Sequence, residues 1–271
     1  MASGLLGIGG GVFMVPFLYF LMAHSAWSGL GVIPQDQAAL AHATSLAVIA
    51  PTAISGVLAY RRRGVVSWDG LLPLGIGAGL AALLGAAIAA NLPAILLKTA
   101  FGAFLLVMAW RLFRGGRKVV ARTEESSKIT GWVGGLAGGG TVGLLSALLG
   151  VGGGVVAIPV LLRWGRVGIE KVAPASLAII TFAALAGTLG YAVSGMAVET
   201  LPPGSVGYVH LPLLLAMLPG AIVMAPLGAA WNQRLPVSVL RRIFAILLLV
   251  VGARLLWVHL PQLLNGSTGS L

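Results

Sequence analysis

The sequence predicts an all-α integral membrane protein made of two inverted-topology helical repeats. About nine membrane segments are expected, some of them glycine-broken or re-entrant. Three observations predict this: the composition, a series of apolar runs, and a long internal duplication. Of the 271 residues, 58% are hydrophobic and 8% are charged, and the mean hydropathy is +1.02. Because a soluble domain carries about 25% charged residues, this chain cannot cover a water-facing surface.

Nine runs along the chain are almost free of charge, and most have the roughly 20 residues that a helix needs to cross the hydrocarbon core. The first run lacks a basic leader and contains Pro16, so we expect a permanent segment and not a signal peptide. The sixth is too short to span alone and follows the fifth through a glycine cluster, which predicts a break or a re-entrant turn. In order, the runs are 4–23, 37–60, 71–90, 92–113, 129–149, 151–162, 172–193, 209–231 and 235–260.

The positions of the basic residues predict which side of the membrane each loop occupies. The formal net charge is +11, and Lys and Arg in short loops stay in the cytoplasm. Nine crossings that start inside place the N-terminus, the 61–63 loop and the 114–128 linker in the cytoplasm. All but two of the 17 basic residues then lie inside, and the exceptions are Lys98 and Arg254. We therefore expect a multi-pass protein of a bacterial-type inner membrane, with the lipid bilayer and not a nucleic acid as its partner.

The chain contains a duplication. Residues 3–16 reappear as residues 146–159, with nine of fourteen positions identical. Matches continue downstream and pair Ser45 with Ser176, Lys98 with Arg241, and Phe101 with Phe244.

Loop charges are opposite in the two halves, since the basic 61–63 loop corresponds to a base-free stretch around Glu199. Two halves inserted upside down relative to each other are therefore predicted. We divide the chain into a first transmembrane repeat (1–118), a basic linker with the start of a connecting helix (119–140), and a second, inverted repeat (141–271). The run 129–149 has no counterpart before Ser3, so either the first half has lost a helix or the chain starts late.

Glycine-interrupted segments at matching places in two inverted halves are typical of a transporter's binding site. A helix that starts after such a break points free N–H groups and its positive dipole end at the gap, which favours an anion. Close helix packing is the alternative reason for these glycines, and hydroxyls in helices often bond to their own carbonyls. We predict backbone donors and hydroxyl donors for a small anionic substrate at Gly9, Gly10, Gly11, Gly152, Gly153, Gly154, Thr44, Ser45 and Ser176.

The remaining polar residues narrow the function. All six acidic residues fall at loops, which disfavours a cation carrier because cation pathways use intramembrane carboxylates. Hydrolase and metal motifs are missing and there is no cysteine, so we expect no enzyme, no metal and no cofactor. His42 is a possible proton-coupling residue, although its repeat counterpart is Ala173. Tyr60 and Tyr191 end their runs and are expected in an interfacial aromatic belt.

The duplicated motif L-L-G-[I/V]-G-G-G-x4-P, with a Thr-Ser-Leu or Ala-Ser-Leu helix start downstream of each copy, resembles the sulfite exporter TauE/SafE family over nearly the whole chain. The second half departs from the first, with Pro174-Ala175 where Ala43-Thr44 stand. The resemblance implies an exporter of small sulfur-containing anions such as sulfite or organosulfonates. Alternatives are a passive anion channel, a carrier of another small organic anion, and a non-transporting membrane partner. A homodimer is possible.

Overall fold

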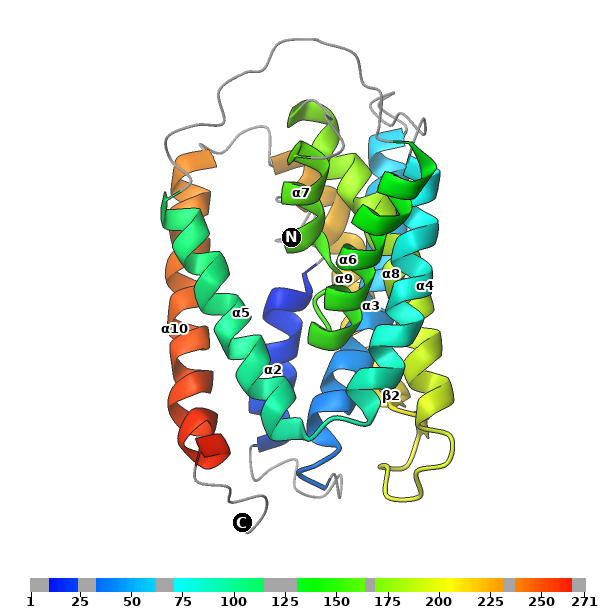
Figure 1. Cartoon of the computed structure of the whole chain (residues 1–271), viewed down its shortest axis with the longest axis vertical. Coiled ribbons are helices and arrows are strands. Elements are labelled where there is room, and N and C mark those ends of the chain that lie inside the picture. Colours follow the sequence, from blue (N-terminus) through cyan, green and yellow to red (C-terminus); the bar gives the residue numbers. More distant parts are fainter. Residues whose placement is uncertain are drawn as a thin grey trace.

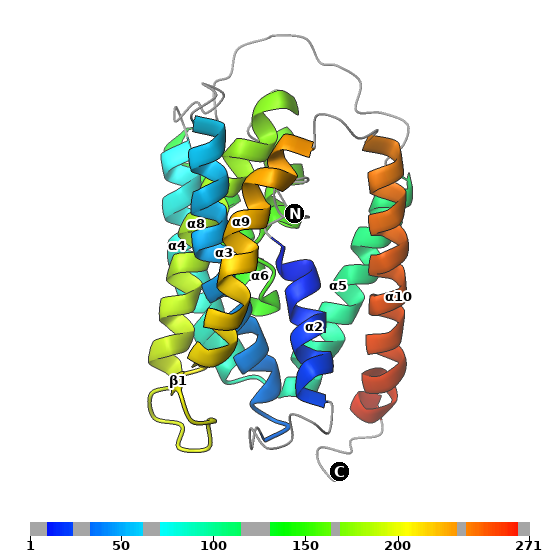
Figure 2. The same cartoon turned by 180° about the vertical axis from the view of Figure 1, so that it is seen from behind.

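The computed structural model describes residues 10–23, 33–61, 71–114, 131–163, 169–231 and 237–264. These residues form helices and one small hairpin, arranged as a bundle (Figures 1 and 2). The helices are α2 (Gly11–Ala23), α3 (Gln37–Arg61), α4 (Leu71–Ala90), α5 (Ala94–Arg114), α6 (Trp132–Leu149), α7 (Gly154–Arg163), α8 (Ile169–Ser194), α9 (Leu211–Trp231) and α10 (Val237–Leu264), and the antiparallel strands are β1 (Ser205–Val206) and β2 (Val209–His210).

Each apolar run of the sequence overlaps one of these helices, which confirms an all-helical membrane fold. Among the described residues, six helices are long and apolar enough to cross a membrane, namely α3, α4, α5, α6, α8 and α10. Helix α7 has 10 residues and is therefore about 15 Å long, half of the roughly 30 Å hydrocarbon core. The sixth run is too short to span alone, as its length predicted.

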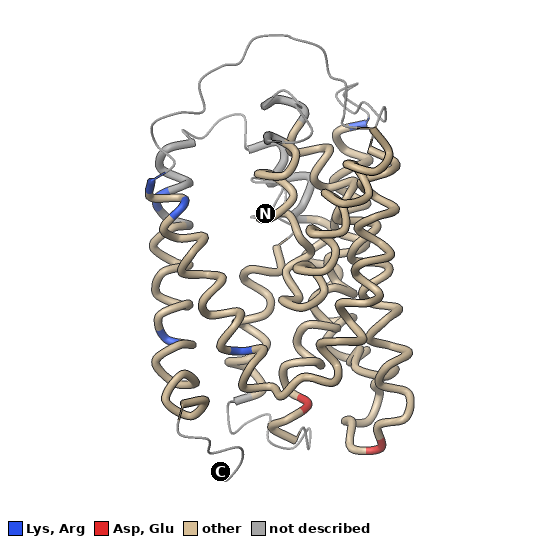
Figure 3. Tube along the Cα trace, in the orientation of Figure 1, with Lys and Arg blue, Asp and Glu red and all other residues tan. Residues whose placement is uncertain are grey.

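The two ends of the bundle differ in charge. Helices α3 and α5 end in Arg61 and Arg114 at one end, which we call the basic end. Asp36 precedes α3 and Glu199 follows α8 at the opposite end, which we call the acidic end. Figure 3 shows this separation, with one further basic position on each of α5 and α10 nearer the acidic end.

Helices α2 and α7 occupy different levels of the bundle. Helix α2 lies in the half toward the acidic end, and α7 lies in the half toward the basic end (Figure 1). Each starts near mid-height, next to its glycine motif, and runs outward toward its own end. Helix α6 runs from the basic end to the same level, and α7 returns from there to the basic end (Figure 1).

Glycine lets α4 and α6 touch backbone to backbone. A Cβ atom added at Gly143 of α6 would overlap the carbonyl group of Ala78, and one added at Gly139 would overlap that of Leu74. Small residues allow this approach in membrane helices, where lipid removes the hydrophobic drive for association. Helices α4 and α6 make the most extensive contact between two elements of the described bundle.

The position of Tyr191 corrects the expectation of an aromatic belt. Its side chain is 0% exposed, and its hydroxyl donates a hydrogen bond to the Ala147 carbonyl at 2.9 Å. Tyr191 therefore fastens α8 to α6 inside the protein and does not face a membrane interface. A tyrosine at the end of an apolar run looks the same in sequence in either role.

Candidate functional site

The two glycine motifs adopt the same local structure. Gly10 and Gly153 occupy equivalent positions of the duplication and have φ values of 74° and 76°. Each carbonyl accepts hydrogen bonds from the N–H groups three and four residues later, which starts α2 in one half and α7 in the other. Only glycine adopts this left-handed conformation without a steric penalty. The glycines are thus required to begin both of these short helices.

The second motif also reverses the chain. Gly150 ends α6 in the left-handed conformation, and its N–H and that of Val151 are directed at the carbonyls of Ala147 and Ser146. Gly152 follows with φ of 75°. Three left-handed glycines within four residues turn the chain from α6 into α7, which confirms the expected break at this position.

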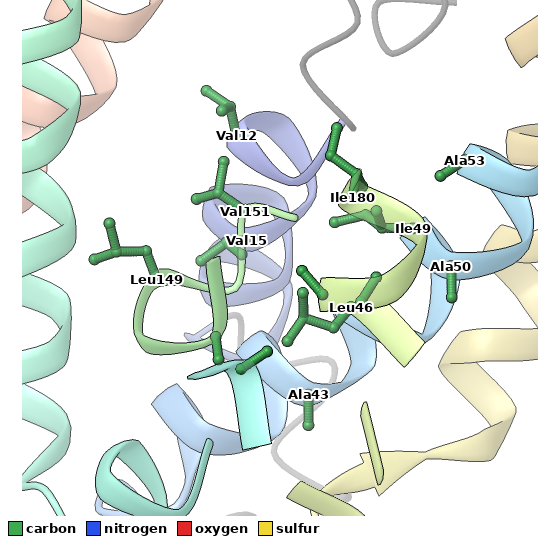
Figure 4. Close-up of a cluster of buried hydrophobic side chains, with 14 of the residues drawn as sticks. Val12, Val15, Ala43, Leu46, Ile49, Ala50, Ala53, Leu149, Val151 and Ile180 are labelled. Atoms are coloured by element: carbon green, nitrogen blue, oxygen red, sulfur yellow. The ribbon is translucent and has the colours of Figure 1, made fainter. Parts of the chain in front are cut away.

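The two breaks meet. A Cβ atom added at Gly11 would lie 2.6 Å from the Val151 Cα and 2.7 Å from the Gly150 oxygen. Figure 4 shows Val12 and Val15 of α2 in one cluster with Val151 and Ile49. The first N–H groups of a helix have no partner within that helix, and the partial positive charge of the dipole is centred there. The N-terminal ends of α2 and α7 therefore converge on one place, which we call the junction.

Packing at the junction is tight and largely apolar. A Cβ atom added at Gly152 would lie 2.8 Å from a methyl carbon of Ile49, and one added at Gly153 would lie 2.8 Å from a methyl carbon of Val142. Close packing alone therefore requires glycine at these positions, whether or not the junction also binds a ligand. Gly154 is the first residue of α7, and Gly9 lies outside the described residues.

The three predicted hydroxyl residues are all fully buried, at 0% exposure. Ser45 donates its hydroxyl proton to the Gly150 carbonyl at 2.8 Å, and Thr44 accepts from the backbone N–H of His210 at 3.1 Å. Ser176 is the counterpart of Ser45 on α8. In this conformation the Ser45 hydroxyl fixes the second glycine break to α3, so its hydrogen is used within the protein.

His42 lies between the junction and a group of polar side chains. Its ring is fully buried, and Nε2 is 2.6 Å from the Tyr19 hydroxyl oxygen. On the other side, a Cβ atom added at Gly150 would lie 2.7 Å from the His42 Cα. Nδ1 has no hydrogen-bond partner among the described residues. His42 therefore contacts both glycine-broken halves.

The structure adds residues that the sequence reasoning did not select. Lys98 of α5 donates to the Gln37 side-chain oxygen at 3.0 Å, and its Nζ is 5.6 Å from the centroid of the Tyr19 ring. We call Tyr19, Gln37, His42 and Lys98 the polar cluster. One signal in the sequence did point to it: Lys98 is an exception to the sidedness of the basic residues.

His210 was also not selected, and it lies next to Thr44 near the acidic end. Its Nδ1 accepts a hydrogen bond from the Leu213 N–H at 3.2 Å and so caps α9. Nε2 then carries the proton of the neutral ring, and it is buried without a partner in the described part of the chain. Burial lowers the pKa of His210 from its usual 6.5.

Within the described ranges, no three His, Cys, Asp or Glu residues gather as a metal site would require. The arrangement combines two short helices in a multi-pass bundle, converging helix N-termini and an inward-facing ammonium group. Broken helices that start inside such a bundle are typical of membrane transporters.

The chain belongs to the sulfite exporter TauE/SafE family, whose family model matches residues 1–255. It is 26% identical over 253 residues to a probable membrane transporter protein of Haemophilus influenzae, covering 92% of this chain and 91% of the relative. It is 27% identical over 269 residues to the probable membrane transporter protein YunE of Bacillus subtilis, covering 94% and 92%. No solved structure matches the chain. This is a family of membrane transporters and not of enzymes.

Proposed function

We propose that the protein is a secondary transporter that exports small sulfur-containing anions, such as sulfite or organosulfonates, by alternating access around the junction. The observation that carries this proposal is the convergence of two equivalent helix N-termini, those of α2 and α7, from opposite ends of the bundle. Backbone donors and positive dipole ends suit an oxyanion. The family to which the chain belongs favours sulfite and related anions as the first candidates.

The pattern of helix contacts supports two inverted repeats. The duplication relates α2, α3, α4 and α5 to α7, α8, α9 and α10. Helix α3 packs against its counterpart α8, and α5 packs against α10. Helix α4 packs against α8, and the counterpart of α4, which is α9, packs against α3. In the same way α2 packs against α3, and its counterpart α7 packs against α8. Such reciprocal pairs are what a pseudo-two-fold axis produces, and the opposite directions of α2 and α7 (Figure 1) favour an axis in the membrane plane.

The tight contact at the junction defines what alternating access requires. With Gly11 against Val151, a sulfite-sized anion has to separate the two breaks in order to bind both helix ends. The Ser45 bond to Gly150 and the fit of His42 against Gly150 hold α3 to the second break. We propose that movement of α2 relative to α6 and α7 opens the junction, with Gly10, Gly153 and Ser176 among the groups that then become donors.

Sidedness is proposed from charge. The basic end faces the cytoplasm of a bacterial-type cell, because basic loops stay inside. The chain has no cysteine, so single cysteines can be labelled without background. In intact cells, a membrane-impermeant maleimide should label Glu199→Cys at the acidic end and leave Arg114→Cys unlabelled until the cells are permeabilised. The reverse pattern would contradict this orientation.

Transport itself is tested in proteoliposomes. Efflux of sulfite or taurine from loaded vesicles should saturate, and it should accelerate when the same anion is present outside. A passive anion channel would show neither behaviour. Flux of acetate or phosphate alone would indicate a carrier of another anion, and no flux of any anion from folded protein would favour a non-transporting partner. Size and mass of the protein in detergent test the possible homodimer.

Ligand binding is measured separately by thermal shift with sulfite, sulfate, thiosulfate, taurine, sulfoacetate, acetate and phosphate. A ligand at a hundred times its dissociation constant adds about 2.7 kcal/mol of stability. Valine at Gly10 or Gly153 is a poor probe of the site, because the φ values of 74° and 76° strain any β-branched side chain. Such variants would report on folding rather than on binding.

A further inference from the structure

The polar cluster contains a cation that the fold turns inward. Lys98 lies near the start of α5, one of the membrane-spanning helices. Its ammonium group contacts the Gln37 oxygen at 3.0 Å and the face of the Tyr19 ring at 5.6 Å. Phe101, one turn along α5, packs edge-on against Tyr19 with ring centroids 6.2 Å apart. The lysine is therefore held between α2 and α3, although a lysine near a helix end can otherwise extend to the interface.

Every partner that the structure shows for Lys98 is uncharged. Gln37 offers an amide oxygen and Tyr19 a ring face, while the neighbouring carboxylate of Asp36 accepts a hydrogen bond from Thr200. Holding an ammonium among neutral groups inside a bundle of membrane-spanning helices is costly unless a counter-charge is present for part of the working cycle.

The duplication provides a second, independent observation. It pairs Lys98 with Arg241 and Phe101 with Phe244, so a basic residue recurs three residues before a phenylalanine in both halves. Lys98 is also one of the basic residues that depart from the sidedness of the rest. Topology does not explain its position, which leaves a role within the protein.

We propose that Lys98, with the side-chain amide of Gln37 and the hydroxyl of Tyr19, forms a binding site for a small oxyanion at the acidic end, distinct from the junction. The anion displaces the Lys98 bond to Gln37 and takes the ammonium as its counter-charge. Tyr19 connects this site to the junction, because its hydroxyl meets His42, which packs against Gly150. The proposal rests on the proposed function, in that the ligand is the transported anion on its way to or from the junction.

Chemical rescue tests this site in one folded preparation. Because the chain has no cysteine, Lys98→Cys introduces a single thiol, and alkylation with 2-bromoethylamine restores an ammonium at nearly the length of lysine. Losing one charge-assisted bond corresponds to roughly 10-fold to 100-fold weaker binding. We expect Lys98→Cys to lose this much anion affinity. Aminoethylation should restore the affinity, and alkylation with iodoacetamide should not restore it. Equal sulfite or taurine affinity in both alkylated forms would overturn the proposal.

Arg254→Met is the matched control. Arg254 is an exposed cation of α10, also away from the basic end, and it lies over the Phe20 ring at 5.7 Å. Its removal subtracts the same charge and should leave anion affinity unchanged within about twofold, since exposed charges are screened. If Arg254→Met weakens binding as much as Lys98→Cys does, a diffuse field and not a site is responsible.

The rate of lysine acetylation tests the same site in the wild-type protein, so the result does not depend on how a variant folds. The chain has four lysines, Lys98, Lys118, Lys128 and Lys171. Saturating sulfite or taurine should slow acetylation of Lys98 several-fold, read by mass spectrometry, and leave the other three unchanged. Unaltered Lys98 reactivity in protein that demonstrably binds the anion would refute this site while leaving the proposed function intact. A wild-type protein that binds none of the anions would refute both.

Discussion

Alanine at Gly143 and alanine at Gly140 should have opposite effects, although both glycines lie on α6 three residues apart. In a helix, alanine is favoured over glycine by about 1 kcal/mol, and both variants receive that gain. At Gly140 the added methyl group has its nearest neighbour, the Ala81 Cβ, at 3.9 Å, which is ordinary contact. At Gly143 the methyl group would overlap the carbonyl group of Ala78, which is helix backbone and cannot rotate away.

The magnitude follows from this difference. Overpacking costs up to about 3 kcal/mol, and at Gly143 we expect the upper limit because α4 and α6 have to move apart. Gly140→Ala should therefore be about 1 kcal/mol more stable than the wild type and Gly143→Ala about 2 kcal/mol less stable. That separation corresponds to melting temperatures roughly 6–12 °C apart, measured on detergent-purified protein. Two variants that melt within about 2 °C of each other would show that the helices are not in backbone contact.

Of three further predictions, two concern the loss of a single hydrogen bond and one concerns the titration of His210. Ser45→Ala leaves the Gly150 carbonyl without its donor, so stability should fall by about 1–2 kcal/mol and amide exchange at the second glycine break should accelerate. Tyr191→Phe removes the bond to Ala147 and should cost a similar amount; an unchanged melting temperature would restore the aromatic-belt interpretation. Because burial lowers the pKa of His210 below 6.5, wild-type stability should be complete above pH 6.5 and decline as the pH falls further. His210→Asn keeps an acceptor that can cap α9 and should lose less stability between pH 7 and pH 5.

Much of the fold could be predicted because the membrane imposes a composition. The run 71–90 coincides with α4, because the charge-poor sequence and the helix have the same limits there. The limits of the run and of the helix agree less well where a helix continues into polar sequence. Helix α8 begins at Ile169 and includes Glu170 and Lys171, and α10 continues through Pro261 to Leu264. Hydropathy locates the apolar part of such helices and not their ends.

The candidate site could be predicted only in part. A left-handed backbone conformation requires glycine in both halves of the chain, so the glycines that start α2 and α7 could be found from the duplication. The contacts that surround them join residues far apart in the chain: Ser45 meets Gly150 across 105 positions, and Thr44 meets His210 across 166. Nothing local in a single sequence shows which residue a side chain on a uniformly apolar helix faces. Lys98 was visible only as an exception to a charge rule, and its inward direction required the structure.

The most extensive helix contacts in the described bundle, α4 with α6 and α8, α5 with α10, and α3 with α8 and α9, all join one half of the chain to the other. This has a consequence for synthesis, which proceeds from the N-terminus. While the first half enters the bilayer, the surfaces that will cover α3, α4 and α5 have not yet been translated. Fully buried positions such as Leu46 and Ala82 remain against lipid or an insertion factor until α8 arrives. The first half therefore lacks most of its packing partners until the second half is made, which predicts that a chain interrupted between them is degraded and does not fold on its own.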